Sequence, residues 1–211
     1  MINAGCGILF VLSGPSAVGK DALLERLLSS DATALWVPGL RRCVTATTRA
    51  ARSGEVDGVD YHFWDAATFE ERIREGALLE WARVHGYHYG TPRAWVEERL
   101  AAGDDVILKI DVQGGLNVKE QRPEAVLIFL LPPSLSELES RAGKRGTESW
   151  PQLATRRRDA GSELSQARLY DYLVVNDHLE TAVAQVGAII VAERCRTARQ
   201  APRWSELWEE C

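Results

Sequence analysis

The chain has 211 residues, of which 45% are hydrophobic and 26% charged, a balance typical of an ordinary soluble globule with one substantial core. A net charge of −5 argues against a general nucleic-acid binder, and the apolar run at residues 8–12 is too short for a membrane span or a secretory signal. The four cysteines show no metal-ligand spacing, so we expect reduced thiols and a cytoplasmic protein.

The first predicted element is a strand over residues 7–13, GILFVLS, whose apolar run is typical of a strand buried on both faces of a parallel sheet. Residues 14–21, GPSAVGKD, fit the pattern Gly-x-x-x-x-Gly-Lys of phosphate-binding loops. A helix is predicted over residues 20–28, where leucines recur at helical spacing. A strand, a glycine loop and a helix in this order predict a site for nucleotide phosphates.

In such a loop the glycines let backbone amides form a concave nest, and the following helix adds its positive end. Lys20 would place a point charge on the β- and γ-phosphates. Asp21 departs from the motif, because a serine or threonine usually binds Mg²⁺ there; as a hard oxygen donor, Asp21 is our hypothesised metal ligand. Ala17 also departs from it, and we expect a negative φ at this alanine. The residues predicted to hold the donor nucleotide are Gly14, Pro15, Ser16, Ala17, Val18, Gly19, Lys20 and Asp21.

Residues 43–89 interrupt the alternation of strands and helices with aromatic residues and short polar turns, which predicts a small inserted α+β subdomain. Arg49 and Arg52 lie three residues apart, so both could fork onto one phosphate, although a solvated loop is the alternative for two such arginines. A helix is then expected to begin at Thr91, with its hydroxyl as the cap and Pro92 in the first turn.

The second half of the chain returns to alternating strands and helices, which predicts an α/β domain with a parallel sheet. Ser134 and Glu137 form a potential capping box for one of the helices. Residues 141–168 carry seven basic and three acidic residues and predict an arginine-rich helical flap. We expect Trp204 and Trp208, in the tail, to pack on the body of the protein. The remaining predicted strands span residues 105–110, 126–131 and 173–175, and a further helix spans 179–195.

Seven segments occur in the order and at the spacing of guanylate kinases, from about residue 8 to about residue 192: GPSAVGK, TATTRAARSGEVDGVDYHF, LLEWARVHGYHYGTPR, IDVQG, FLLPPS, KRGTE and YLVVND. The chain therefore resembles this family of P-loop nucleoside monophosphate kinases. The resemblance implies a P-loop NTPase-type parallel sheet flanked by helices, with a small α+β insert that binds the nucleoside monophosphate and a helical lid. The expected core comprises residues 1–42, 99–134 and 169–211, the insert residues 43–98 and the lid residues 135–168.

The resemblance also implies the activity: transfer of the γ-phosphate of ATP to GMP, and to dGMP, with Mg²⁺, in purine nucleotide metabolism. The expected partners are ATP and GMP, with no nucleic acid and no membrane, in a monomer or homodimer. The implied catalytic residues are Lys20, Arg49, Arg145 and Arg156, with Arg141 a weaker match. The implied GMP-binding residues are Thr45, Arg49, Arg52, Tyr61, Glu80, Tyr89, Thr91 and Asp111.

Glu80 is the residue expected to recognise guanine, because a carboxylate accepts from both N1–H and the exocyclic amine of that base. Adenine lacks N1–H, so discrimination of about 10⁴ against AMP is reasonable for such a site. The alternative is a surface residue on an amphipathic strand.

Lys109 stands where the family usually has the first acid of an Asp-x-Asp pair, whereas Asp111 is retained. The end of this strand and the phosphate loop are neighbours in such a fold. We hypothesise an exchange of charge, in which an acid gained at Asp21 accompanies an acid lost at Lys109.

Two other functions remain as alternatives. Ribose 1,5-bisphosphate phosphokinase resembles guanylate kinase in fold and also carries Gly-Lys-Asp, but Thr45 and Glu80 favour a guanine site. A non-catalytic guanylate-kinase-like binding module usually loses the phosphate loop, whereas Gly19 and Lys20 are present here.

Overall fold

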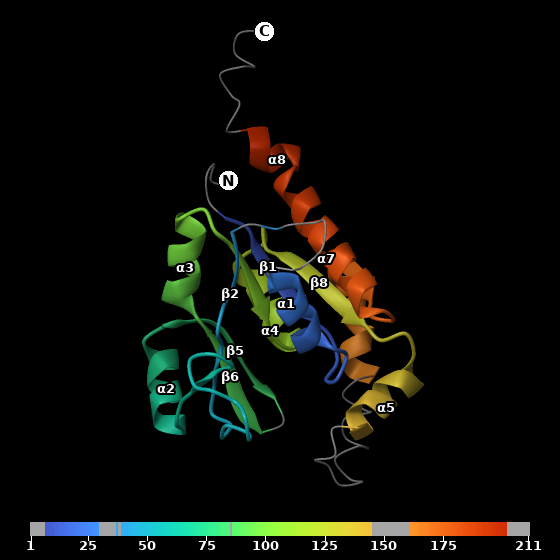
Figure 1. Cartoon of the computed structure of the whole chain (residues 1–211). Coiled ribbons are helices and arrows are strands. Elements are labelled where there is room, and N and C mark those ends of the chain that lie inside the picture. Colours follow the sequence, from blue (N-terminus) through green and yellow to red (C-terminus); the bar gives the residue numbers. More distant parts are fainter. Residues whose placement is uncertain (1–6, 30–36, 38, 85, 145–160, 202–211) are drawn as a thin grey trace, which may run out of the picture.

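The computed structural model describes residues 7–29, 37, 39–84, 86–144 and 161–201. Its centre is a five-stranded sheet in the order β2-β7-β1-β8-β9, and every neighbouring pair is parallel (Figure 1). This arrangement confirms the predicted α/β fold with a parallel sheet. The strands are β1 (Leu9–Ser13), β2 (Leu40–Arg42), β7 (Asp105–Lys109), β8 (Val126–Leu131) and β9 (Tyr172–Val175).

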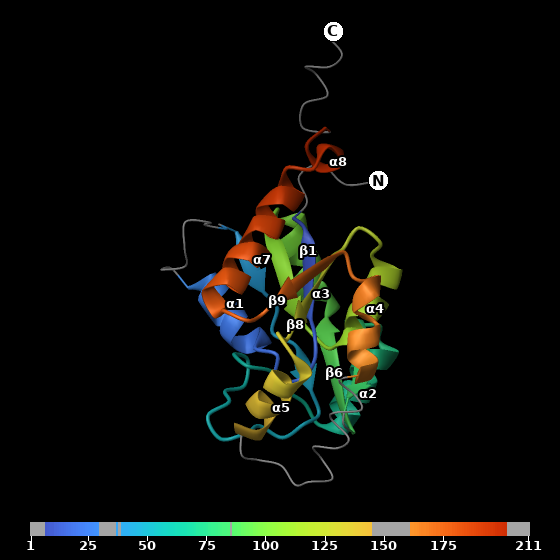
Figure 2. The ribbon, with the colours of Figure 1, turned by 90° about the vertical axis from the view of Figure 1, so that its right-hand side faces the viewer.

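Helices cover both faces of the central sheet (Figure 2). On one face lie α1 (Lys20–Leu28) and α7 (Leu179–Arg194), and on the other lie α3 (Arg93–Ala101) and α4 (Val112–Gln121). Because side chains alternate along a strand, Phe10 and Leu12 of β1 enter the core beneath the first pair of helices. Leu9 and Val11 enter the core beneath the second pair. Burial on both faces explains why β1 has no polar residue before Ser13.

A second, four-stranded sheet lies beyond the carboxyl-terminal edge of the central sheet, within the segment expected for the insert (Figure 1). Helix α2 (Ala66–Arg74) covers it and buries Phe69 against Ala46 and Leu78. The helix begins after Asp65, whose side chain accepts a hydrogen bond from the amide of Thr68 at 2.7 Å. The strands, in the order β4-β3-β6-β5, are β3 (Ala46–Thr47), β4 (His62–Phe63), β5 (Leu78–Val84) and β6 (Tyr87–Pro92).

The segment expected for the lid starts with α5 (Leu135–Lys144), next to the same edge of the central sheet. The amide of Glu137 donates to Ser134 Oγ at 3.1 Å, as the predicted cap requires. Residues 161–165 are helical, and the short 3-10 helix η1 (Ala167–Leu169) leads to β9. Arg145, Arg156, Trp204 and Trp208 lie outside the described residues.

Two local expectations were wrong. Ala17 has a φ of 68°, because the loop backbone turns through the left-handed region there, at a cost of about 1–2 kcal/mol for a residue with a Cβ. Thr91 does not cap α3: it lies in β6 and its hydroxyl donates to Glu80 Oε1 at 2.6 Å. Pro92 occupies the N-cap position, and no side chain caps this helix.

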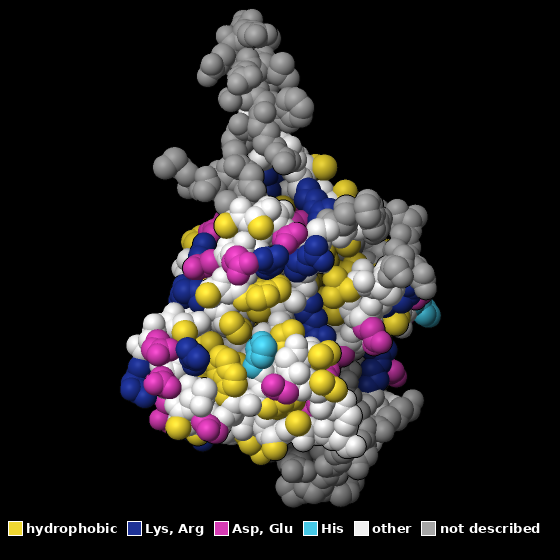
Figure 3. All heavy atoms as spheres, turned by 60° about the vertical axis from the view of Figure 1, so that its left-hand side comes forward, with side chains coloured by type: hydrophobic (Ala, Val, Ile, Leu, Met, Phe, Trp, Pro, Cys, Tyr) yellow, Lys and Arg dark blue, Asp and Glu magenta, His cyan; other side chains and the backbone are white. Residues whose placement is uncertain are grey.

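The surface of the described residues is mixed in charge. On the face shown in Figure 3, basic and acidic side chains are intermingled, with hydrophobic side chains between them. None of the helices in the described part of the chain is long and apolar enough to cross a membrane.

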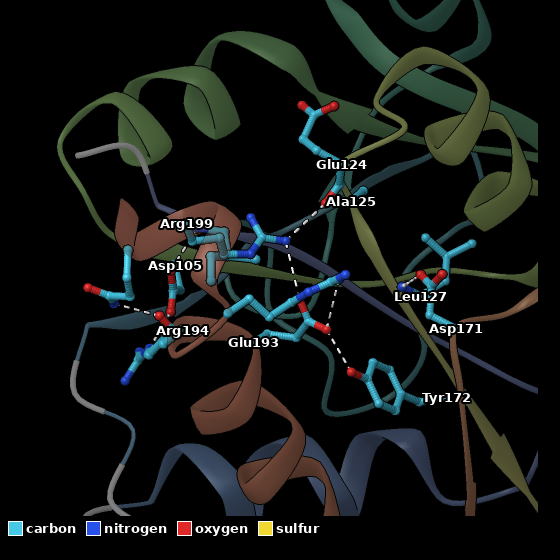
Figure 4. A network of polar contacts seen from close by, with 12 residues as sticks. Asp105, Glu124, Ala125, Leu127, Asp171, Tyr172, Glu193, Arg194 and Arg199 are labelled. Carbon is cyan, nitrogen blue, oxygen red and sulfur yellow. Dashed lines mark hydrogen bonds and ion pairs between the residues drawn. The ribbon is translucent and has the colours of Figure 1, made fainter. Parts of the chain in front are cut away.

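At the amino-terminal edge of the sheet, polar contacts tie the end of α7 to the strands (Figure 4). Asp105 is buried and accepts hydrogen bonds from the amide of Ile8 at 2.7 Å and from Arg194 Nε at 2.6 Å. Glu193 is buried as well and accepts from the hydroxyl of Tyr172 at 2.6 Å. The helix α8 (Thr197–Gln200) follows these contacts. This network is therefore on the opposite edge from the phosphate loop.

We predict that Asp105→Asn lowers the free energy of unfolding by about 1–3 kcal/mol. The amide of Ile8 and the guanidinium of Arg194 would lose a charged acceptor in a buried position. Urea denaturation followed by circular dichroism measures the change. The matched control is Asp104→Asn, whose partners Arg41 and Arg99 lie 3.7 and 3.6 Å away at the surface, so the expected loss is below about 1 kcal/mol. Equal losses in the two variants would contradict the structural role given to Asp105.

Candidate active site

The candidate site is a cleft where the carboxyl ends of β1 and β7 meet the second sheet. The two strands pair with Leu12 opposite Lys109, so the phosphate loop and residues 109–111 leave the sheet side by side. The cleft encloses about 200 Å³. It is lined by Gly14, Ser16, Ala17, Val18, Gly19, Lys20, Asp21, Thr45, Arg49, Arg52, Tyr61, Val84, Tyr89, Lys109, Ile110, Asp111 and Glu163.

Most predicted site residues in the described part of the chain therefore share this lining. Pro15, Glu80 and Thr91 are not among the lining residues. Sequence reasoning assigned no role to Glu163, which comes from the helical segment before η1 and lies in the cleft.

The phosphate loop depends on two glycines with positive φ. A Cβ at Gly19, where φ is 102°, would lie 2.4 Å from Asn176 Nδ2, and one at Gly14 would lie 2.4 Å from the carbonyl oxygen of Leu130. Asn176 is buried and donates to the carbonyl of Val18 at 2.8 Å, so it supports the loop from behind. This residue of the segment YLVVND was not predicted as part of the site.

Lys20 folds over the loop from the first position of α1. Its ammonium donates to the carbonyl of Gly14 and, at 3.0 Å, to that of Pro15. Burial lowers the pKa of Lys20 to about 8, while Glu163 and Asp21 oppose that effect. Phosphate groups would favour the charged form, so a bound nucleotide would raise this pKa again.

Asp21 and Lys109 form an ion pair at the border of the cleft, as the charge-exchange hypothesis requires. Lys109 Nζ donates to Asp21 Oδ1 and lies 5.2 Å from the centre of the Tyr61 ring. The Lys109 side chain is only 10% exposed, whereas that of Asp21 is 64% exposed. Burial works to raise the pKa of Asp21, but Lys109 and Lys20 outweigh it, and the net pKa lies below its usual value.

The opposite wall carries the arginine and tyrosine side chains expected to bind an acceptor phosphate. Arg49 makes a two-pronged ion pair with Glu55, at 2.8 and 2.9 Å, and its guanidinium lies 5.5 Å from the centre of the Tyr61 ring. Glu55 also accepts from the amide of Arg52 at 2.7 Å. The Tyr61 and Tyr89 rings meet edge to face at 6.0 Å. The Arg49 side chain is therefore held in place and is not a solvated side chain of a loop. Glu55, which holds it, was not predicted from the sequence as part of the site.

Glu80 is buried next to the cleft, with 4% of its surface exposed. Its Oε1 accepts from Thr91, and a Cβ at Gly114 would lie 2.7 Å from its Oε2, so only glycine leaves room for the carboxyl group at the start of α4. Burial raises the pKa of Glu80 to about 8; Thr91 opposes this shift and Asp111 adds to it. Asp111 caps α4 through a 3.1 Å bond from the amide of Gly114. The alternative of a surface residue at this position is therefore wrong.

Arg141 reaches toward the phosphate loop from α5. Its Nε donates to Glu137 at 2.8 Å and its Nη1 donates to the carbonyl of Asn176 at 3.1 Å. It contacts the segment that supports the loop.

A parallel sheet with a glycine loop between its first strand and first helix, and a lysine bent over that loop, defines a P-loop nucleotide-binding protein. A family model described as guanylate kinase matches residues 7–193 of this chain. The chain belongs to the guanylate kinase family, which makes it a nucleoside monophosphate kinase.

Individual relatives agree with this assignment. A guanylate kinase of Symbiobacterium thermophilum is 48% identical over 199 residues, which cover 94% of this chain and 92% of that protein. One of Thermus thermophilus is 51% identical over 193 residues, covering 92% and 84% of the two chains. The crystal structure of guanylate kinase from Anaplasma phagocytophilum superposes with a TM-score of 0.77 at 32% identity, covering 93% of this chain and 90% of that one.

We predict that Glu80→Gln removes a pH dependence of stability. A carboxyl group whose pKa rises from 4.5 to about 8 on folding binds its proton more tightly in the folded state. The wild-type protein therefore loses stability as the pH rises from about 4.5 to about 8, with a slope of up to about 1.4 kcal/mol per pH unit.

Urea denaturation of both proteins at intervals between pH 5 and pH 9 measures this difference. The stability of the glutamine variant relative to the wild type should increase across that range, because the amide keeps the acceptor for Thr91 and cannot ionise. Parallel curves for the two proteins would show that the carboxyl group is ionised in the free protein.

Proposed function

We propose that this chain transfers the γ-phosphate of ATP to GMP, giving ADP and GDP, and that it accepts dGMP as well. The observation that carries the proposal is a single cleft with the phosphate loop and Lys20 on one wall and Arg49, Arg52 and Tyr61 on the other. Two anionic nucleotides can meet in such a cleft. Family membership supports the same pair of substrates.

Phosphoryl transfer depends on positioning and charge neutralisation more than on covalent chemistry by the protein. The amides of the loop and Lys20 would hold the β- and γ-phosphates of ATP. Arg49 and Arg52 would grip the phosphate of GMP, together with the hydroxyls of Tyr61 and Tyr89. No general base is required, because the attacking phosphate oxygen of GMP is already ionised. Closure around the substrates would exclude the water that otherwise hydrolyses ATP.

Mg²⁺ is the expected partner of the ATP phosphates, and Asp21 fits a metal site of the kind that kinases use. Such sites take one or two carboxylates and complete the shell with phosphate oxygens and water. Asp21 is a carboxylate next to Lys20 that lines the cleft, and its side chain is 64% exposed although it pairs with Lys109. When bound, Mg²⁺ would neutralise charge on the β- and γ-phosphates.

Guanine recognition is assigned to the buried end of the site. Glu80 in its ionised form would accept from N1–H and from the exocyclic amine of guanine, with Thr45, Thr91 and Asp111 around the base. Hydrogen bonds of this kind strengthen in a desolvated site and leave an unpaired carboxylate when the base lacks the donors. We place this activity in purine nucleotide metabolism in the cytoplasm, in a monomer or a homodimer.

The test is ADP release with Mg²⁺, ATP and one acceptor at a time: GMP, dGMP, AMP, CMP, UMP or ribose 1,5-bisphosphate. We expect turnover with GMP and dGMP, and a kcat/KM for AMP lower by about 10⁴. Glu80→Gln should lower kcat/KM for GMP by about 10², because its amide cannot accept from both donors of guanine. The ratio of kcat/KM for GMP to kcat/KM for AMP should therefore fall. A purified protein that ignores GMP but binds ATP would overturn the proposal, and turnover with the ribose bisphosphate would replace it with the other kinase.

A further inference from the structure

Lys109 is a cation of the cleft to which no role in the reaction has yet been given. It is the last residue of β7 and follows the buried residues Val106, Ile107 and Leu108. Its side chain lines the cleft together with Lys20 and Arg49. The question is what stabilises a charged side chain at the end of a buried strand, where it borders the phosphate loop.

The contacts of Lys109 place its ammonium between the two walls of the cleft. On the side of the phosphate loop it donates to Asp21, the second residue of α1. On the other side its Nζ lies 5.2 Å from the centre of the Tyr61 ring, next to the arginine wall. It thus occupies the boundary between the region assigned to the donor phosphates and the region assigned to the acceptor phosphate.

Burial makes this placement costly without an anion. An ammonium that loses its water is stable only when paired and hydrogen-bonded, and the Lys109 side chain is 10% exposed. Asp21 supplies a partner but is itself 64% exposed, so the pair opens onto the cleft and is not sealed into the core. A pair that served only to join α1 to β7 would have no need to border the phosphate site.

The balance of charge in the cleft favours a cation over a carboxylate at position 109. A carboxylate at position 109 would stand next to Asp21 and face two sets of phosphates. Two like charges placed side by side would repel each other. With Lys109 in place, the charge of the carboxylate at position 21 is offset, and the ammonium keeps further N–H donors for phosphate oxygens.

We propose that Lys109 is a substrate-contacting residue that binds phosphate oxygens where the donor and acceptor nucleotides meet, and that Asp21 is the positioning residue that holds its ammonium there. Lys109 acts as a fixed positive charge: it transfers no proton and forms no covalent bond. The inference rests on the proposed phosphoryl transfer from ATP to GMP.

The first experiment compares Lys109→Gln, Lys109→Arg and the wild type in steady-state kinetics and in ligand binding. The binding probe is adenosine joined to guanosine through a five-phosphate chain, which spans both halves of the site, and guanosine serves as a probe without phosphate. We expect Lys109→Gln to lower kcat by about 10–10³ and to weaken binding of the linked dinucleotide by at least about tenfold, with guanosine binding unchanged. Lys109→Arg should recover part of both losses, because it keeps the charge.

The matched control is Lys119→Gln. Lys119 also pairs with an aspartate, Asp171, at 2.9 Å, but it lies in α4 and is absent from the lining of the cleft. We expect the kcat of Lys119→Gln and its affinity for the linked dinucleotide to equal those of the wild type. Thermal melts of all variants show whether a loss of activity follows from a loss of fold.

The second experiment is a double-mutant cycle on the pair, with Asp21→Ser, Lys109→Asp and both changes together. If the two residues work as a unit, the double variant should keep more activity than the product of the two single losses, by at least about fivefold. A double variant no better than that product overturns the positioning role of Asp21.

The outcomes separate this inference from the proposed function. A wild-type protein that releases no ADP with GMP would end the proposed function. An active wild type whose Lys109→Gln variant keeps full kcat and full affinity for the linked dinucleotide would overturn only the role of Lys109. If Lys109→Gln fails to fold, a second uncharged variant, Lys109→Met, carries the test: unchanged kcat and unchanged affinity for the linked dinucleotide would also overturn it.

Discussion

The site depends on the parallel pairing of β1 with β7. Parallel strands end at the same edge of a sheet, so this pairing brings the loop after Ser13 beside the residues after Lys109, almost 100 positions later in the chain. The hydroxyl of Ser13 donates to the carbonyl of Asp111 at 3.2 Å and joins the two strand ends directly. The second sheet meets this edge and adds the arginine wall. Without the pairing, Lys20, Asp21 and Lys109 would not face one space.

Three cations of the cleft share a second physical feature, which is that each already has an internal partner. Lys20 donates to loop carbonyls, Arg49 forks onto Glu55 and Lys109 donates to Asp21. Buried or half-buried positive charges are costly without such partners. The same partners fix the side chains near their working positions, so that less conformational freedom is lost when phosphates bind. In the proposed reaction, the carboxylates of Asp21 and Glu55 would thus act on phosphate recognition through the cations that they orient.

Sequence patterns predicted the central architecture because the spacing of apolar residues reflects which positions are buried. The apolar runs of β1 and β8 and the helical spacing of α1 follow directly from their neighbours in the core. The two wrong expectations, at Ala17 and Thr91, concern positions where tertiary contacts determine the local conformation. The positive φ of Ala17 follows from the path of the loop, and Thr91 faces Glu80 because β5 and β6 pair there. Glu55 and Asn176 line up against other residues of the site, through contacts that no local sequence pattern records. The roles of Arg145 and Arg156 stay predictions.

Glu80 shows how burial shapes selectivity. In the free protein its pKa of about 8 keeps the carboxyl group largely protonated at neutral pH. Guanine would favour the ionised form, because its N1–H and amine both donate to a carboxylate, whereas adenine offers an acceptor at N1. Binding of guanine must therefore expel a proton, and part of the interaction energy is used in that step. The same low polarity that raises the pKa also strengthens the two hydrogen bonds once they form, and it raises the cost of leaving the carboxylate unpaired. Selectivity for guanine would therefore depend on the ionised form of Glu80, because the protonated form would donate to N1 of adenine.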